Sequence, residues 1–254
     1  MSKTGNLSIN SENIFPIIKK WLYSDHDIFV RELVSNGCDA ITKLKKLEAM
    51  GQYTFPDNYK AKIEVICDPD AKTLKFIDNG LGMDEDEVEK YITQIAFSGA
   101  TDFLEKYKDK ANNDEIIGHF GLGFYSAFMV SDKVVVKSRP YGSDEAYSWT
   151  SEGDDGYTIE PCIMDEYGTK VILHIKEDTE DNKYSEYLDQ YTISNLVKKY
   201  SDFIHYPIKM MWKTSQKVEG SENEYQDVFE ERTLNSMVPI WKKSKDEVTE
   251  EEYN

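Results

Sequence analysis

The chain has 254 residues and a mass of 29.4 kDa, the size of one large domain or of one domain with part of a second. Apolar residues make up 39% of it and aromatic residues 13%, which is enough for a sizeable core. Lys and Arg number 30 against 48 Asp and Glu, so the formal net charge is −18. Because this charge repels polyanions at long range, we expect neither a nucleic-acid partner nor a membrane-surface role.

Cysteines and histidines are too few and too scattered to predict a disulfide framework or a zinc site. The chain has three cysteines and four histidines. No apolar stretch approaches the roughly 20 residues of a membrane-spanning helix. Met1–Gly5 lacks the basic and apolar regions of a secretory signal. Together these features predict a cytoplasmic protein.

Apolar periodicity and turn residues divide the chain into helices and strands. Helices are predicted at residues 11–23, 27–50, 84–96, 124–130 and 193–203. Strands are predicted at residues 62–67, 73–77, 133–138, 146–150, 157–159, 170–175 and 208–212. Hairpins join most of these strands and helices are interposed, so we predict an α+β two-layer sandwich and not a doubly wound parallel sheet.

A change in composition at Thr214 divides the chain into three parts. Residues 1–213 are predicted to form the main domain. Residues 214–233 are mostly polar and weakly patterned at their start, so we expect a linker there. Apolar residues then return, but so short a piece cannot form a core alone. Residues 234–254 are therefore expected to begin a further, truncated domain.

The long helix predicted at 27–50 carries a distinctive polar face. Its members recur every three or four positions, which places them on one side of the helix: Glu32, Asn36, Asp39 and Lys43. Such a face is often simply solvated. Gly37 favours a functional reading, because glycine in mid-helix costs about 1 kcal/mol relative to alanine and leaves room for close packing. Both interpretations fit this face.

The second candidate is DNGLGM at residues 78–83, directly after a predicted strand. Asp78 ends that strand, where a carboxylate can accept hydrogen bonds from a planar amine edge. Gly80 and Gly82 permit unusual backbone dihedrals or the close approach of a ligand. Taken alone, Asn-Gly is an ordinary turn signal.

The third candidate is a run of glycines at 118, 121 and 123, just before the short helix predicted at 124–130. Glycine-rich backbone ahead of a helix N-terminus presents free N–H groups and the positive end of the helix dipole, which suits a phosphate. The pattern is GxxGxG and differs from the GxGxxG of dinucleotide folds, and the sequence contains no P-loop GxxxxGK[ST]. A flexible hinge is the alternative interpretation.

The order and spacing of these segments are more specific than any one of them. The chain contains ELVSN-x-x-DA at 32–40, DNGLGM at 78–83, GHFGLGFYSAF at 118–128 and GT at 168–169. Together they resemble the four-part signature of the GHKL (Bergerat) ATP-binding fold. Within that superfamily, FVRELVSN, IGHFGLGFYS and HYPI closely resemble the ninety-kilodalton heat-shock chaperones of bacterial type. The resemblance implies a mixed, mostly antiparallel sheet covered on one face by helices.

The resemblance also implies a role for each candidate residue. Glu32 matches the family's general base, which polarises the water that attacks the γ-phosphate, and Asn36 matches the asparagine that helps to hold Mg²⁺. Asp78 matches the aspartate that binds the adenine amino group, and Thr169 supports the same network through water. The other residues implied to bind ATP are Asp39, Gly80, Gly82, Met83, Gly118, Gly121, Gly123 and Phe124.

The function implied by the resemblance is that of an ATP-binding and ATP-hydrolysing chaperone domain, with ATP or ADP and Mg²⁺ as cofactors. A lid at about 98–123 would close over ATP and promote association of two N-terminal domains. The implied partners are nucleotide, client proteins, other chaperones and, in the full-length protein, a second copy in a homodimer. We expect weak hydrolysis by this chain, because the family's catalytic arginine lies in the middle domain, beyond Asn254. Two alternatives stay open: a nucleotide-gated binding module without hydrolysis, and the ATP domain of another GHKL member.

Overall fold

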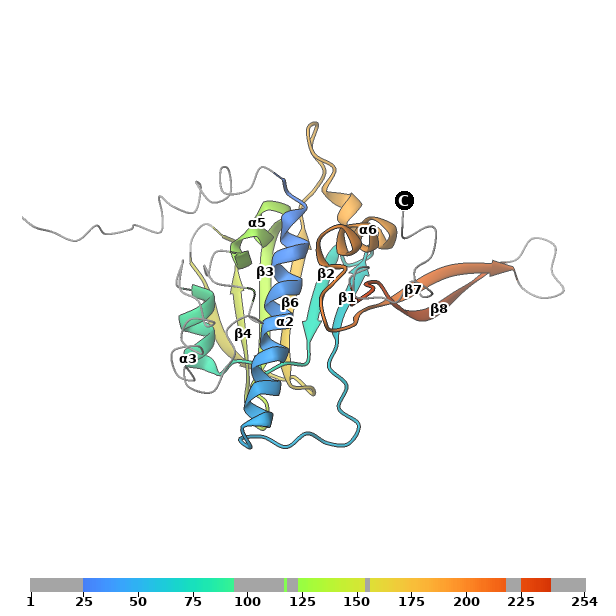
Figure 1. Ribbon diagram of the computed structural model, residues 1–254. Coiled ribbons are helices and arrows are strands. Elements are labelled where there is room, and N and C mark those ends of the chain that lie inside the picture. Colours follow the sequence, from blue (N-terminus) through green and yellow to red (C-terminus); the bar gives the residue numbers. More distant parts are fainter. Residues whose placement is uncertain (1–24, 94–116, 118–122, 154–155, 218–224, 239–254) are drawn as a thin grey trace, which may run out of the picture.

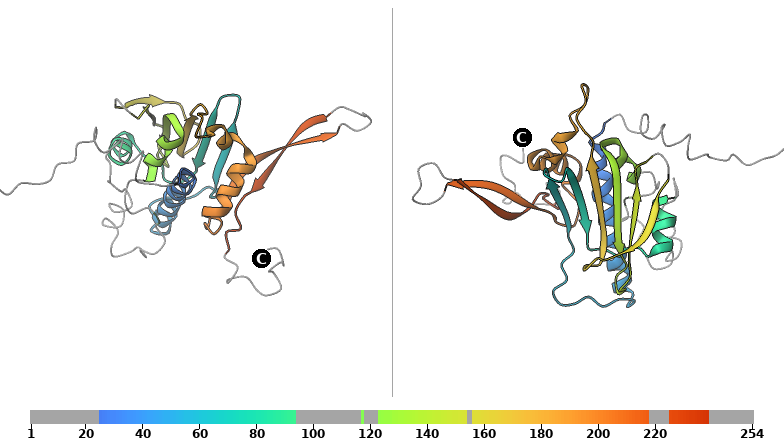
Figure 2. Two further views of the ribbon diagram at one scale, coloured as in Figure 1. Left: turned by 90° about the horizontal axis from the view of Figure 1, so that it is seen from above. Right: turned by 180° about the vertical axis from the view of Figure 1, so that it is seen from behind.

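An eight-stranded sheet with helices packed on one face forms the body of the protein (Figure 1). The computed structural model describes residues 25–93, 117, 123–153, 156–217 and 225–238. The strand order is β5-β4-β3-β6-β2-β1-β7-β8, and all neighbours are antiparallel except β1 and β7. Seen from above and from behind, the helices lie to one side of the sheet (Figure 2). The predicted α+β fold with a mixed, mostly antiparallel sheet is confirmed.

The elements follow the predicted order closely. The strands are β1 (Ile63–Asp68), β2 (Thr73–Asp78), β3 (Ser131–Arg139), β4 (Ala146–Ser151), β5 (Thr158–Cys162), β6 (Gly168–Ile175), β7 (Ile208–Lys217) and β8 (Tyr225–Thr233). The α-helices are α2 (Ile28–Ala49), α3 (Glu85–Val88), α5 (Ala127–Val130) and α6 (Gln190–Ser201). Single turns of other helix types are η2 (Glu89–Thr93), η4 (Gly123–Ser126) and η5 (Tyr184–Leu188).

The long helix α2 packs against the sheet and supplies a large part of the core (Figure 1). Its apolar stripe is buried throughout, because a spacing of three and four residues keeps these side chains on the sheet side: Val30, Leu33, Ile41, Leu44 and Leu47. Gly51 ends the helix with a φ of 76°, a left-handed conformation that glycine adopts without strain. Because the apolar stripe faces the sheet, the polar face of α2 lies on another side of the helix.

The hairpin of β1 and β2 carries the polar loop 78–83 at its end. Asp68 begins the tight turn and its Oδ1 accepts a hydrogen bond from the Ala71 N–H at 3.0 Å. Apolar residues of β2, Leu74 and Phe76, point into the core. Because β2 also pairs with β6, Asp78 lies directly opposite Thr169 in the sheet. The register therefore brings the second and fourth sequence motifs together.

Two predicted helices differ in detail from the structure. In the segment predicted as a helix at 84–96, α3 begins with a capping box between Asp84 and Glu87 and changes to a π-helical turn at Glu89–Thr93. The helix predicted at 124–130 begins as the 3₁₀ turn η4 before α5. Residues 11–23, predicted as a helix, lie outside the described residues.

The expected linker is instead mostly β-structure. Residues 214–217 continue β7, and residues 225–233 form β8, which pairs with β7 along its whole length. The polar composition has a structural reason: this hairpin extends away from the body (Figure 1), and oppositely charged side chains form ion pairs between its two strands. Lys213 and Asp227 form an ion pair at 2.8 Å, and Lys209 pairs with Glu231. Polar sequence here marks an exposed hairpin.

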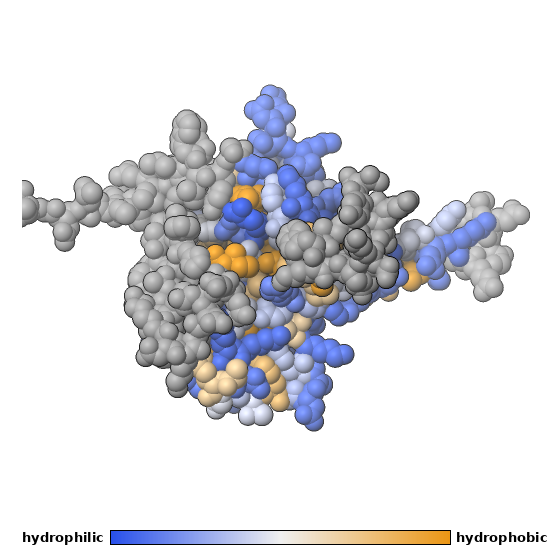
Figure 3. Space-filling model, in the orientation of Figure 1, coloured by the Kyte–Doolittle hydropathy of each residue, from blue (hydrophilic) through white to orange (hydrophobic). Residues whose placement is uncertain are grey.

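On the helix side, the described residues that are visible are mostly hydrophilic, with apolar residues in small patches among them (Figure 3). Among the described helices, none is long and apolar enough to cross a membrane. All three cysteines are described and are free thiols.

Candidate functional site

The residues on the polar face of α2 differ in how far they are exposed. Glu32 is half-buried, with 19% of its side chain exposed, and Asn36 is exposed one turn further on. Asp39 is 5% exposed, although it carries a carboxylate. A buried carboxylate requires hydrogen-bond partners to be tolerated. This face is therefore more than a solvated surface.

The two ends of the glycine-rich segment contact this face of α2. Asp39 Oδ1 accepts a hydrogen bond from the Ile117 N–H at 2.8 Å. Gly123 lies against the Glu32 carboxylate, so closely that a Cβ at this position would overlap Glu32 Oε2. Glu32 Oε1 is paired with the Arg31 guanidinium at 2.5 Å. Gly118 and Gly121, and most of the expected lid at 98–123, lie outside the described residues.

Asp78 is a buried carboxylate at the end of β2. Its Oδ1 accepts a hydrogen bond from the Gly80 N–H at 2.9 Å, and its side chain is 8% exposed. Burial raises the pKa of Asp78 from its ordinary 3.8 to about 7, and hydrogen bonds from the backbone N–H groups of Gly80 and Thr169 oppose that rise. Because a buried carboxylate is stabilised by each further hydrogen-bond donor, Asp78 is suited to accept a hydrogen bond from a ligand.

Glycines bring the helix and the polar loop close to Asp78. A Cβ on Gly37 would lie 3.2 Å from the Cβ of Asp78, so the small residue predicted to admit close packing admits the end of β2. Gly80 lies against the backbone of Ala40, where any Cβ would collide, and the Leu81 N–H donates to the Ala40 carbonyl oxygen at 3.1 Å. Contacts within the protein therefore fix the loop to α2 without help from a ligand.

Ser138, which the sequence analysis did not single out, lies at the centre of the polar network. Its Oγ accepts a hydrogen bond from the Met83 N–H at 2.9 Å and lies 3.0 Å from Thr169 Oγ1. It also donates to the Gly168 carbonyl oxygen at 3.2 Å. The sequence held no motif for it, because only the structure shows that this last position of a predicted strand is fully buried.

The two apolar residues expected to contact base and sugar lie in different surroundings. Met83 is half-buried and packs against the edge of the core. Phe124 is 7% exposed and packs among aromatic rings of the core, with its centroid 5.6 Å from that of Trp149. In this structure Phe124 supports η4 from within the core.

The polar side chains of the site offer oxygen atoms, which are the ligands that Mg²⁺ prefers. Among the described residues no cluster of three or more His, Cys, Asp or Glu side chains is arranged to hold a metal. Mg²⁺ is commonly held by one or two protein oxygens together with phosphate oxygens and water. The exposed amide of Asn36, one turn from Glu32, offers one such oxygen. The residues present thus fit a magnesium ion that arrives with a phosphate ligand.

Four separate motifs thus meet at one place: α2, the 78–83 loop, the end of the glycine-rich segment and the start of β6. The family model described as "Histidine kinase-, DNA gyrase B-, and HSP90-like ATPase" matches residues 23–179, which contain all four. The chain belongs to this ATPase family. A second model, "Hsp90 protein", matches residues 186–233 and so includes the β7–β8 hairpin.

Similar proteins agree with this assignment. The chain is 50% identical over 245 residues to the chaperone protein HtpG of Bacillus velezensis, covering 96% of this chain and 39% of the relative. It is 48% identical over 243 residues to HtpG of Bacillus subtilis, with the same coverage of 96% and 39%. It is 44% identical over 253 residues to HtpG of Clostridium botulinum, covering 99% and 40%. The chain spans about two fifths of the length of these relatives.

Proposed function

We propose that this chain is the ATP-binding and ATP-hydrolysing domain of a molecular chaperone. The observation that carries the proposal is that one helix, α2, contacts both the end of β2 and the end of the glycine-rich segment. Gly37 brings the helix to Asp78, and Gly123 brings the glycine-rich segment to Glu32. One helix thereby links a candidate base-binding carboxylate to a candidate hydrolytic one.

Asp78 is proposed to bind the adenine amino group. Its carboxylate is buried, anchored by the Gly80 N–H and opposite Thr169 in the sheet. Burial removes this carboxylate from the hydrogen bonds that water would donate. An amino group of a ligand that donates to it would replace one of them. Thr169 and Ser138, whose hydroxyl oxygens lie 3.0 Å apart, would fix the surrounding hydrogen bonds. Gly82 and Met83 would line the same end of the site.

Glu32 is proposed to act at the phosphate end as general base. It is held on a rigid helix and lies against Gly123, the residue that begins η4. A carboxylate so placed can orient a water and accept its proton at Oε2, while Oε1 stays paired with Arg31. Asn36 would hold Mg²⁺, which when bound neutralises charge on the phosphates. The glycine-rich backbone would supply further N–H groups to the phosphates.

The wider biology is proposed from the relatives, which are named as chaperones. It comprises a cytoplasmic location, a homodimer in the longer protein, a stress response, and action on client proteins with other chaperones. Lid closure over ATP, involving residues 98–123, would couple nucleotide state to association of two such domains. We propose the domain boundaries predicted from sequence with one change: residues 225–233 pair with β7 and so belong to the sheet.

The alternative function is a nucleotide-gated binding module without hydrolysis. Glu32→Gln in the longer protein distinguishes it from an ATPase. We expect Mg·ATP affinity within about threefold of wild type and a loss of turnover of about 100-fold or more. Glu48→Gln, an exposed residue on the same helix, is the matched control and should change neither quantity. Wild-type protein that binds Mg·ATP without measurable turnover would support the binding module instead.

A further inference from the structure

The end of β3 forms the support on which the loop 81–83 lies. The Met83 N–H donates to Ser138 Oγ at 2.9 Å, and the Tyr141 N–H donates to the Leu81 carbonyl oxygen at 2.8 Å. Gly82, which lies between Leu81 and Met83, contacts the same stretch of backbone after β3. The position of this loop therefore depends on where the chain runs just after β3.

Gly82 contacts the backbone of Arg139 so closely that no side chain could be accommodated. Its φ is 70°, and a Cβ there would overlap the Arg139 carbonyl oxygen. A displacement of the Arg139 backbone would thus be transmitted directly to Gly82, since no flexible side chain lies between them.

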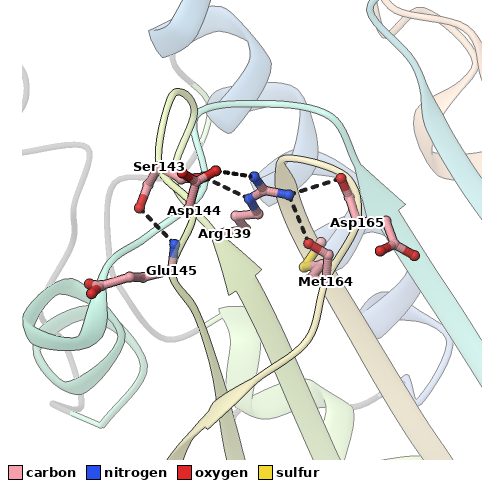
Figure 4. Close-up of polar contacts among 6 residues, drawn as sticks. All are labelled: Arg139, Ser143, Asp144, Glu145, Met164 and Asp165. Atoms are coloured by element: carbon pink, nitrogen blue, oxygen red, sulfur yellow. Dashed lines mark hydrogen bonds and ion pairs between the residues drawn. The ribbon is translucent and has the colours of Figure 1, made fainter.

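The guanidinium of Arg139 holds the Arg139 backbone in place through hydrogen bonds to two other loops (Figure 4). Its Nε donates to the Ser143 carbonyl oxygen at 2.7 Å, and one terminal nitrogen donates to the carbonyl oxygens of Met164 and Asp165, both at 2.9 Å. The guanidinium also lies over the Tyr167 ring, 4.6 Å from its centroid. Three backbone acceptors and a ring hold it in one geometry, as the planar donor fork of arginine permits.

These contacts join the two loops that flank the candidate adenine site. One is the turn between β3 and β4, and the other is the 163–167 segment that leads into Gly168 and Thr169. The ion pair with Asp144, at 3.1 Å, adds little because the Asp144 side chain is fully exposed. Arg139 itself has only 14% of its side chain exposed, so its hydrogen bonds to carbonyl oxygens are mostly shielded from water.

We propose that Arg139 is a positioning residue for nucleotide binding, which acts through the backbone of residues 138–141 on the loop 81–83. This inference rests on the proposed function, since it concerns the adenine end of the same site. It requires no contact between Arg139 and the ligand. Lysine cannot replace it fully, because one ammonium cannot reach both loops in a fixed plane.

The experiment compares Arg139→Ala and Arg139→Lys with wild type in two measurements. The first is Kd for Mg·ATP by calorimetry, where we expect a weakening of about tenfold for Ala and a smaller weakening for Lys. The second is hydrogen exchange of the Met83 and Tyr141 amides in nucleotide-free protein, which should quicken at least tenfold in Arg139→Ala. Amides of β1 and β2 report any general loss of stability and should change much less.

Arg232→Ala is the matched control, because that guanidinium also lies over a ring, Trp212 at 4.8 Å, but on the remote β8. It should leave Kd within twofold of wild type. Folded Arg139 variants with wild-type Kd would overturn the inference, and so would weaker binding with unchanged exchange at Met83 and Tyr141. If the wild-type chain bound no Mg·ATP, the proposed function would fail and this inference with it.

Discussion

Gly37 and Asp78 lie in contact, with the position of a Cβ on the glycine only 3.2 Å from the Cβ of the aspartate. The same Cβ would lie 3.4 Å from Ile63 on the neighbouring strand. The glycine therefore sets how near α2 approaches the end of β2. It also explains why a residue of low helix propensity stands in the middle of a 22-residue helix.

Gly37→Val should force α2 and β2 apart. Overpacking at a buried helix–sheet contact costs about 1 to 3 kcal/mol in the free energy of unfolding, and the displacement should weaken Mg·ATP binding as well. Urea unfolding and calorimetry measure the two effects. Ala49→Val, at an exposed position of the same helix, should cost less than about 1 kcal/mol and leave binding unchanged. Equal effects of the two substitutions would refute the proposed contact.

The raised pKa of Asp78 predicts pH-dependent ligand affinity. The ligand-free carboxyl has a pKa of about 7, and an adenine amino group would donate to its ionised form. Affinity should therefore rise with pH and level off above 7, with about tenfold weaker binding at pH 6 than at pH 8. Adenosine is the appropriate ligand, since it has no phosphate to titrate. Affinity that is flat from pH 6 to pH 8 would contradict this assignment.

The same pKa predicts how stability changes with pH in the ligand-free protein. Because the folded-state pKa lies above the ordinary value of 3.8, folding favours the protonated form. The stabilisation is complete below about pH 4 and is lost as pH rises through 7. Asp78→Asn, which cannot ionise, should raise the free energy of unfolding at pH 8 by about 1 to 3 kcal/mol. Its advantage should shrink at pH 5, and thermal unfolding at both pH values measures it.

Gly123→Ala should separate turnover from binding. The added Cβ would overlap Glu32 Oε2, and the flexible end of Glu32 can move aside at little cost in stability. We expect a melting temperature within a few degrees of wild type, near-normal Mg·ATP binding and at least tenfold slower turnover in the longer protein. Turnover at the wild-type rate would show that the contact between Gly123 and Glu32 has no part in hydrolysis.

Much of the fold could be predicted from local pattern. The period of 3.6 in α2 and the alternation in β1 and β2 reflect burial against one core, and both are plain in the sequence. The linker was predicted wrongly, because charged cross-strand pairs such as Lys213 and Asp227 give no apolar alternation. An exposed hairpin and a linker have the same composition.

The site was predictable as a set of motifs but not as a network. The sequence predicts close approach at glycines 37, 80 and 82, and these glycines pack against Asp78, Ala40 and Arg139, respectively. Ser138 and Arg139 were missed, since a serine and an arginine at a strand end carry no motif. Their importance comes from β3 pairing with β6, a contact between residues about 30 positions apart in the chain. Long-range pairing of this kind is not visible in local sequence.

The central claim is that Asp78 binds the base of a nucleotide, and calorimetric titration with Mg·ATP tests it most directly. Wild type and Asp78→Asn are compared with Asp70→Asn, which changes an exposed aspartate in the turn of the same hairpin. We predict saturable one-site binding by wild type and Asp70→Asn, and affinity at least 100-fold weaker in Asp78→Asn. Asp78→Asn that is folded and binds as tightly as wild type would contradict the account.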